Sequence, residues 1–168
     1  MALSAQNPLT PKKMNWHIAL IYFILWLMAF MSLMNGLMSV FGVQVGPTAD
    51  GGMGIALHVY PSMEYPQLFI LDGVFSLMMS MYAVFVRFQL AGFKRRAPIY
   101  LTILFALNIL ESILYAVMLN VLVPEMVAAS AANGANIALN TVGGAVLSAV
   151  VAALNWVYYS RRREMFTK

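Results

Sequence analysis

Two carboxylates lie inside long apolar stretches of this chain, and their types and positions could support chemistry. Asp72 lies in the stretch from about 66 to 86, and Glu111 lies near the middle of the stretch from about 98 to 123. A charged side chain at the centre of a membrane helix costs roughly 2.5–3.5 kcal/mol on insertion scales. Acidic residues at such positions usually face a bundle interior, pair with another group or bind a proton. The two carboxylates therefore mark a candidate intramembrane polar site.

Further polar residues accompany the two carboxylates at helical spacing. Residues three or four positions apart share one face of a helix. This spacing places Ser76 on the face of Asp72, and it gives the first apolar stretch a polar face around Asn35. The complete candidate site consists of Asp72, Asn108, Glu111, Ser112, Tyr115, Asn35 and Ser76.

Two interpretations of this site remain open from the sequence. The stripes can enclose a polar pocket or proton-binding site centred on Glu111. They can also form hydrogen bonds that only hold the helices together, at about 0.6 kcal/mol per contact. Glu111 favours the first interpretation, because Gln or Asn would join helices at a lower insertion cost. The Ser and Asn residues favour the second.

Four apolar stretches must position these side chains. The chain is 62% hydrophobic and 10% charged, whereas a soluble domain is nearer half apolar and a quarter charged. A helix needs roughly 20 apolar residues to cross a bilayer core, and backbone groups in lipid must be paired within the helix. We therefore predict an all-α polytopic membrane protein, an antiparallel four-helix transmembrane bundle. The predicted spans cover about 16–41, 66–86, 98–123 and 137–159.

The basic residues predict the orientation of these spans. All ten Lys and Arg residues lie outside the apolar stretches. Lys12 and Lys13 precede the first stretch, four basic residues lie within 87–96, and four more follow the last stretch from Arg161 onwards. The two other connections carry none. Because basic residues are retained on the cytoplasmic side, we expect a multi-pass protein with both termini in the cytoplasm.

The domain organisation follows from the spans. We expect a lead-in over 1–15, a single four-span domain over 16–160 and a basic cytoplasmic tail over 161–168. The longest connection, about 44–63, lies on the outer side and contains turn-forming Gly and Pro residues. The segment 126–136 fits either the first turns of the fourth helix or an interfacial segment.

Small residues in the fourth stretch predict close helix packing. Gly144, Ser148 and Ala152 recur every four residues, and a series of alanines from Ala145 to Ala153 runs beside them. Small side chains let membrane helices approach closely. One series can pack within the bundle, and the other can pack against a partner membrane protein or a second copy of this chain.

Several chemistries have no support in the sequence. The chain has no Cys, which excludes disulfides and thiolate chemistry. His17 and His58 are expected on opposite sides of the membrane, with His17 anchoring the first span at the interface. The 14 Met residues suit flexible packing better than a Cu(I) site, since no Cys or His stands at ligand spacing. Catalytic motifs such as HExxH and GxSxG are absent. We therefore expect no enzyme activity, no metal and no cofactor.

The placement of the positive charge argues against a nucleic-acid partner. The formal charge is +4, but the basic residues flank spans and do not gather in one sequence patch. Juxtamembrane basic clusters suit anionic lipid of the inner leaflet. The expected partner at these positions is the lipid bilayer.

The segment from Asn155 to Phe166, NWVYYSRRREMF, resembles the end of a family of small four-span bacterial inner-membrane proteins. That family is classed only as a domain of unknown function. Its last helix typically ends in aromatics around a Tyr, a Ser, a short basic run and a Phe. The turn from Phe85 to Phe88 is similar to the family's second-span ending, whereas Asn15-Trp16 departs from its Gly-Trp opening. The resemblance implies a bacterial inner membrane and four spans, and it brings no activity or functional residues.

Three functions follow in order of preference. The first is a non-enzymatic integral inner-membrane protein, an accessory or regulatory subunit acting through other membrane components. The alternative is a small transporter, channel or small-molecule binder that uses the acidic site. A further alternative is an immunity-type protein against a pore-forming toxin. An open cavity lined by Asp72, Glu111 and Tyr115 would favour the transporter or binder, and a filled bundle with exposed small residues would favour the subunit.

Overall fold

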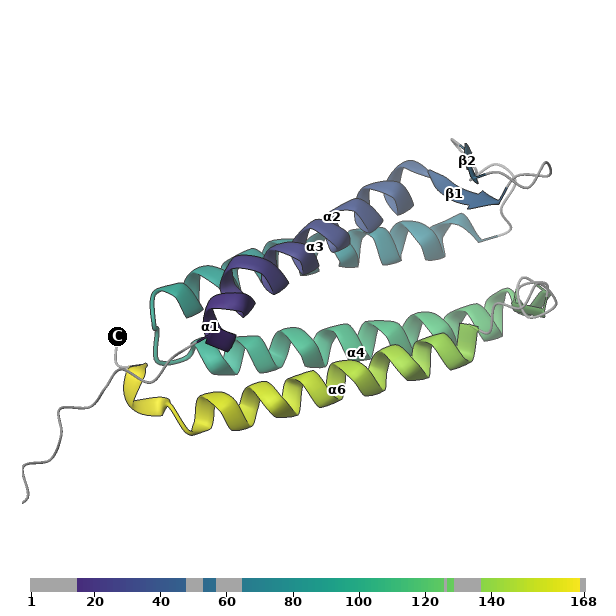
Figure 1. Ribbon diagram of the computed structural model, residues 1–168. Coiled ribbons are helices and arrows are strands. Elements are labelled where there is room, and N and C mark those ends of the chain that lie inside the picture. The colour runs from purple at the N-terminus through teal and green to yellow at the C-terminus, as the bar shows by residue number, and fades with distance from the viewer. Residues whose placement is uncertain (1–14, 48–52, 57–64, 126, 129–136, 167–168) are drawn as a thin grey trace, which may run out of the picture.

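Four long helices build the chain, as the computed structural model shows for the residues that it describes (Figure 1). These residues are 15–47, 53–56, 65–125, 127–128 and 137–166. Each long helix is apolar enough to cross a membrane, and the spans are Asn15–Phe41, Pro66–Ala91, Ala97–Leu122 and Val142–Ser160. The prediction of an all-α, antiparallel four-helix membrane bundle is confirmed. Most of the ambiguous segment 126–136 lies outside the described residues, as does His58.

The first span combines three helical segments and ends at a glycine. It consists of α1 (Asn15–Ala19), a π-helical turn (Leu20–Ile24) and α2 (Leu25–Phe41). Gly42 follows in the left-handed conformation with φ 64°, and the Val43 amide donates to the Met38 carbonyl at 2.8 Å. A left-handed residue at this position closes a helix end, and glycine adopts it without strain.

Two short strands follow in the loop that the sequence places on the outer side. β1 (Gln44–Pro47) pairs antiparallel with β2 (Met53–Ala56), with Val45 opposite Ile55. The predicted turn formers Gly46 and Pro47 thus belong to a strand pair, which the sequence did not predict.

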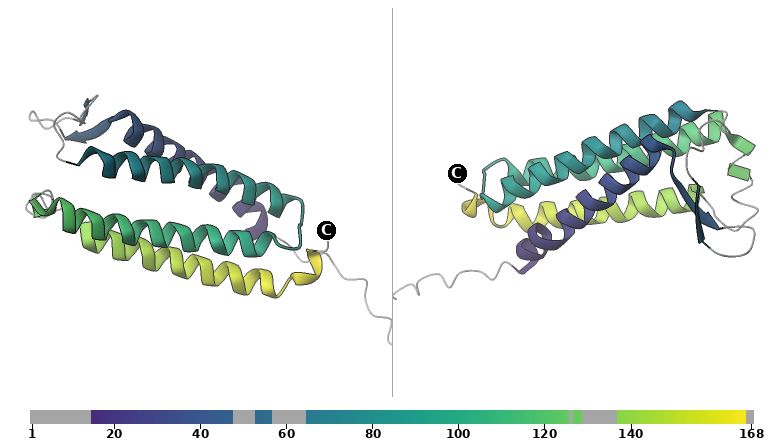
Figure 2. Two further views of the ribbon diagram at one scale, coloured as in Figure 1. Left: turned by 180° about the vertical axis from the view of Figure 1, so that it is seen from behind. Right: turned by 90° about the horizontal axis from the view of Figure 1, so that it is seen from above.

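Three further long helices complete two antiparallel pairs with α2. These helices are α3 (Pro66–Ala91), α4 (Ala97–Leu122) and α6 (Ile137–Ser160). Proline stands in the first turn of both α3 and α4, where its missing N–H and restricted φ cost nothing. α2 packs on α3, α4 packs on α6, and α3 and α4 join the two pairs (Figures 1 and 2).

One end of the bundle carries the described basic residues, and we call it the basic end. It contains the α3–α4 turn, the start of α1 and the end of α6, whereas the two strands lie at the opposite end (Figure 1). The core is concentrated in the half of the helices next to the basic end. Its largest fully buried side chains are Tyr159, Leu20, Leu25, Leu90, Leu101, Leu104, Val86 and Asn155.

A glycine contact brings α2 and α3 together beyond this core. A Cβ added to Gly36 would lie 2.7 Å from Leu77 Cγ and 2.8 Å from the Gly73 carbonyl oxygen. A Cβ added to Gly73 would lie 2.9 Å from the Val40 backbone nitrogen. The two helices therefore touch backbone to backbone, as small residues permit in membrane helices. The right-hand view of Figure 2 shows α2 running obliquely to α3.

Candidate functional site

A hydrogen-bonded chain of polar side chains links three of the four spans. Asn35 Nδ2 on α2 donates to Ser76 Oγ on α3 at 3.0 Å. The Ser76 hydroxyl in turn donates to Glu111 Oε1 on α4 at 3.2 Å. Asn35 Nδ2 also lies 3.5 Å from Asp72 Oδ2, one helical turn from Ser76. The structure thus brings four predicted site residues together.

The four residues differ in how much of each side chain is covered. Ser76 is buried, with 4% of its surface exposed. Asp72 and Glu111 are half-buried, and Asn35 is exposed. A polar group facing lipid is costly, and the bonds to Ser76 and Asp72 satisfy the amide nitrogen of Asn35 within the chain. The chain of hydrogen bonds therefore runs from a buried serine to an open side of the bundle.

The other three predicted site residues, Asn108, Ser112 and Tyr115, contact other groups. Asn108 Oδ1 accepts a bond from Ser148 Oγ at 3.4 Å and so connects α4 with α6. Ser112 Oγ donates to the Asn108 carbonyl of its own helix at 2.9 Å. The Tyr115 ring meets Phe69 of α3 edge-on, with ring centroids 6.5 Å apart. The polar face of α4 therefore divides between α3 and α6 and does not gather around Glu111.

The predicted packing residues of α6 are only partly used within the chain. Ser148 bonds to α4, and Ala152 packs against the core. Gly143 and Gly144 are exposed, and a Cβ added to either would meet nothing within 4 Å. Ala149 and Ala153 are also exposed. Small residues thus remain uncovered on α6, in contrast to Gly36 and Gly73 on the other helix pair.

A second polar cluster, which the sequence analysis missed, joins the first helix to the last at the basic end. His17 is only 3% exposed, so the prediction that it anchors the span at the interface is wrong. Its Nδ1 lies 2.9 Å from the Tyr159 hydroxyl. Beside it, Trp16 Nε1 donates to Asn155 Oδ1 at 3.0 Å. The nearest sequence signal was the aromatic-rich helix end around Tyr159, which does not by itself indicate α1 as its partner.

Aromatic rings enclose His17. The Phe93 ring lies 5.0 Å and the Phe166 ring 6.1 Å from the His17 ring, measured between centroids. No partner for His17 Nε2 is found among the described residues. We call His17, Phe93, Tyr159 and Phe166 the histidine cluster. It ties together α1, the α3–α4 turn and the segment after α6.

Phe93 occupies this cluster at the expense of backbone strain. Its φ is 50°, a left-handed conformation that costs a non-glycine residue roughly 1–2 kcal/mol. The conformation closes α3, since the Phe93 amide donates to the Leu90 carbonyl at 3.0 Å and the Lys94 amide to the Gln89 carbonyl at 3.1 Å. Glycine would relieve the strain, but it would remove the ring that lies 5.0 Å from the His17 ring.

Together these features define a class: a multi-pass α-helical membrane protein with a polar network between its spans and the histidine cluster at its basic end. The described residues contain no group of three or more His, Cys, Asp or Glu that could hold a metal ion. No family model, no curated protein and no solved structure matches the chain. The resemblance of residues 155–166 to a bacterial four-span family therefore stays a prediction.

Proposed function

We propose that this chain is a non-enzymatic integral protein of a bacterial inner membrane, an accessory or regulatory subunit that acts through other membrane components. The uncovered small residues of α6 carry this proposal. In the α2–α3 pair, Gly36 and Gly73 lie in close backbone contact. Gly143 and Gly144 of α6 have no such contact: within the described part of the chain, a Cβ added to either would meet nothing within 4 Å.

The energetics of glycine strengthen this argument. Glycine inside a helix costs about 1 kcal/mol relative to alanine, and close helix contact is a common benefit in membranes. In the α2–α3 pair, Gly36 and Gly73 gain this close contact from each other's helix. For Gly143 and Gly144 it would come from a helix of another chain packed on α6.

The proposed orientation places the basic end in the cytoplasm. The described basic residues gather there, which suits retention of Lys and Arg on the inner side. The similarity of residues 155–166 to bacterial inner-membrane proteins supports the same location.

Assembly of the intact protein tests the subunit proposal. The tagged full chain, extracted from its own membrane in mild detergent, should migrate as a complex larger than the 18.6 kDa chain with its micelle. Ala153→Leu adds bulk to an exposed alanine of α6 and should release the chain from this complex. Ala106→Leu makes the same change at an exposed alanine of α4 and should leave the complex intact. A complex that survives Ala153→Leu and Gly143→Leu would refute the proposed use of α6.

A small transporter, channel or binder is the second candidate. The hydrogen bonds that link Asn35, Ser76 and Glu111 favour it. Asn35 is exposed, so a polar solute or a proton could reach the Glu111 carboxyl along these hydrogen bonds. Proton flux into proteoliposomes, lost in Glu111→Gln and kept in Ser112→Ala, would establish this function. Equal flux in empty and protein-containing vesicles would argue against a proton pathway. The immunity-type alternative stays a prediction without a specific observation in its favour.

A further inference from the structure

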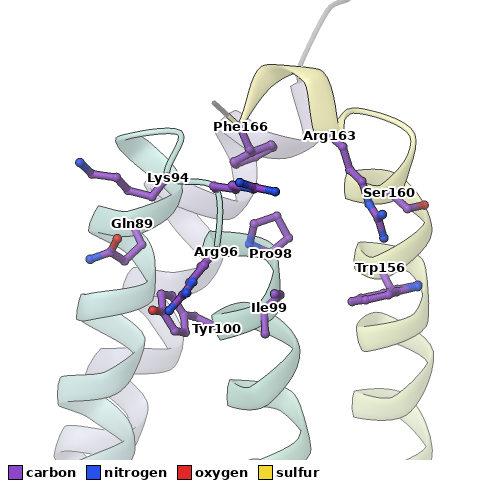
Figure 3. Close-up of a pocket in the computed structure, with 11 residues that line it drawn as sticks. Gln89, Lys94, Arg96, Pro98, Ile99, Tyr100, Trp156, Ser160, Arg163 and Phe166 are labelled. Carbon is purple, nitrogen blue, oxygen red and sulfur yellow. The ribbon is translucent and has the colours of Figure 1, made fainter. Parts of the chain in front are cut away.

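A large pocket opens at the basic end, separate from the intramembrane network. Its volume is about 1070 Å³, and the α3–α4 turn, the first turn of α4, the end of α6 and the following segment surround it (Figure 3). The lining residues are Gln89, Lys94, Arg95, Arg96, Pro98, Ile99, Tyr100, Trp156, Ser160, Arg163 and Phe166.

Four of the residues that line the pocket are cationic. Lys94, Arg95 and Arg96 come from the turn, Arg163 comes from the segment after α6, and none of the lining residues is acidic. Figure 3 shows Arg163 reaching down on the α6 side of the pocket, while Arg96 lies on the α4 side. Positive groups from two distant parts of the chain thus converge on one space. Arg in particular binds phosphate oxygens through two parallel hydrogen bonds.

Apolar residues of two membrane-spanning helices also line the pocket. Ile99 lies near the start of α4 and Trp156 lies one turn before the end of α6. Their side chains are 49% and 47% exposed, so they remain free for contact with an apolar ligand. A soluble anion would use only the cations. A ligand with an anionic head and an apolar body would use both the cations and the apolar residues.

We propose that this pocket binds an anionic phospholipid, with the headgroup phosphate between the turn and Arg163 and the acyl chains along Ile99 and Trp156. Basic pockets between membrane helices are suited to anionic headgroups. The position suits a lipid, because the cations lie at the helix ends, whereas Ile99 lies in the first turn of α4 and Trp156 lies one turn inside α6. This inference does not rest on the proposed subunit function, because Gly143 and Gly144, which carry that proposal, lie at the opposite end of α6 from the pocket.

Quenching of Trp156 fluorescence by brominated lipid tests the inference directly. The chain has three Trp residues, and Trp16→Phe with Trp26→Phe leaves Trp156 as the only one. In phosphatidylcholine bilayers, brominated phosphatidylglycerol should quench Trp156 at a lower mole fraction than brominated phosphatidylcholine. Arg163→Gln should reduce this preference about fivefold, the effect of one basic residue near an anionic surface. Arg96→Gln combined with Arg163→Gln should remove most of it.

Arg161→Gln is the matched control, because it removes the same charge from an exposed residue that does not line the pocket. Equal losses in Arg161→Gln and Arg163→Gln, or equal quenching by the two lipids, would overturn the inference. Release of the quenching by millimolar glycerol phosphate would show a site for free phosphate and would overturn the lipid assignment. Native mass spectrometry of the chain with all three Trp residues provides a second readout: retained phosphatidylglycerol should be lost in Arg163→Gln and kept in Arg161→Gln.

Discussion

The Ser76 hydroxyl on α3 donates to the Glu111 carboxyl on α4 across 3.2 Å, and it is the link between the two helix pairs in the candidate site. Its lone pairs accept the bond from Asn35 at 3.0 Å. One buried hydroxyl thus serves as donor and acceptor, and its position decides whether α2, α3 and α4 share a network.

Ser76→Ala should destabilise the bundle, because it breaks both of these bonds. At about 0.6 kcal/mol for an interhelical hydrogen bond in a membrane protein, the expected loss is about 1 kcal/mol in the free energy of unfolding. Denaturing-detergent titration of the purified chain measures it. Ser112→Ala is the control, since among the described residues the Ser112 hydroxyl bonds to the Asn108 carbonyl of its own helix. Equal losses in the two variants would contradict an interhelical role for Ser76.

Gly36→Ala should weaken the α2–α3 contact. The new Cβ would lie 2.7 Å from Leu77 Cγ and 2.8 Å from the Gly73 carbonyl oxygen, and overpacking of this kind costs about 1–3 kcal/mol. Gly143→Ala adds the same methyl group where nothing lies within 4 Å, and it should stabilise α6 by up to about 1 kcal/mol. The same titration compares them, and a Gly36→Ala variant as stable as Gly143→Ala would show that the two helices do not touch at this glycine.

Tyr159→Phe should loosen the histidine cluster, since it leaves buried His17 Nδ1 without its partner at 2.9 Å. An unsatisfied buried polar atom costs about 1–3 kcal/mol. Tyr158→Phe is the neighbouring control, because the Tyr158 hydroxyl is buried and has no partner among the described residues. Its removal should leave the free energy of unfolding unchanged or slightly improved. Equal destabilisation by both variants would exclude a special role for the Tyr159 hydroxyl.

Reporter fusions should place the two ends of the bundle on opposite sides of the membrane. A fusion after Lys168 should report the cytoplasm, and a fusion at Asp50 should report the outer compartment, because the basic residues flank only the inner connections. Signals from the same compartment at both positions would refute the four-span topology.

The long helices were predictable because crossing a membrane imposes a length and a composition on each span. The polar partners were less predictable, since periodicity shows which residues share a helix face but not which neighbouring helix that face meets. Asn108 and Glu111 stand on one face of α4 in the sequence, yet the first bonds towards α6 and the second towards α3. The rotation and tilt of each helix decide such choices.

Glycine contacts show the same limitation. The stripes around Asn35 and Ser76 were interpreted as polar, although Gly36 and Gly73 beside them bring α2 and α3 into contact. A search for small residues in the first two spans, as in the fourth, would have found these glycines. The pairing of His17 with Tyr159 has no local signal, because 142 residues separate the two side chains.

That separation has a consequence for how the protein is made. Ribosomes add about 5–20 residues per second, so on the order of 10 s passes between synthesis of His17 and synthesis of Tyr159. Throughout this interval His17 cannot form its contact with Tyr159. A chain truncated before residue 159 would lack both Tyr159 and Phe166. Its histidine cluster could not form, and we expect a quality-control protease to degrade it faster than the full chain.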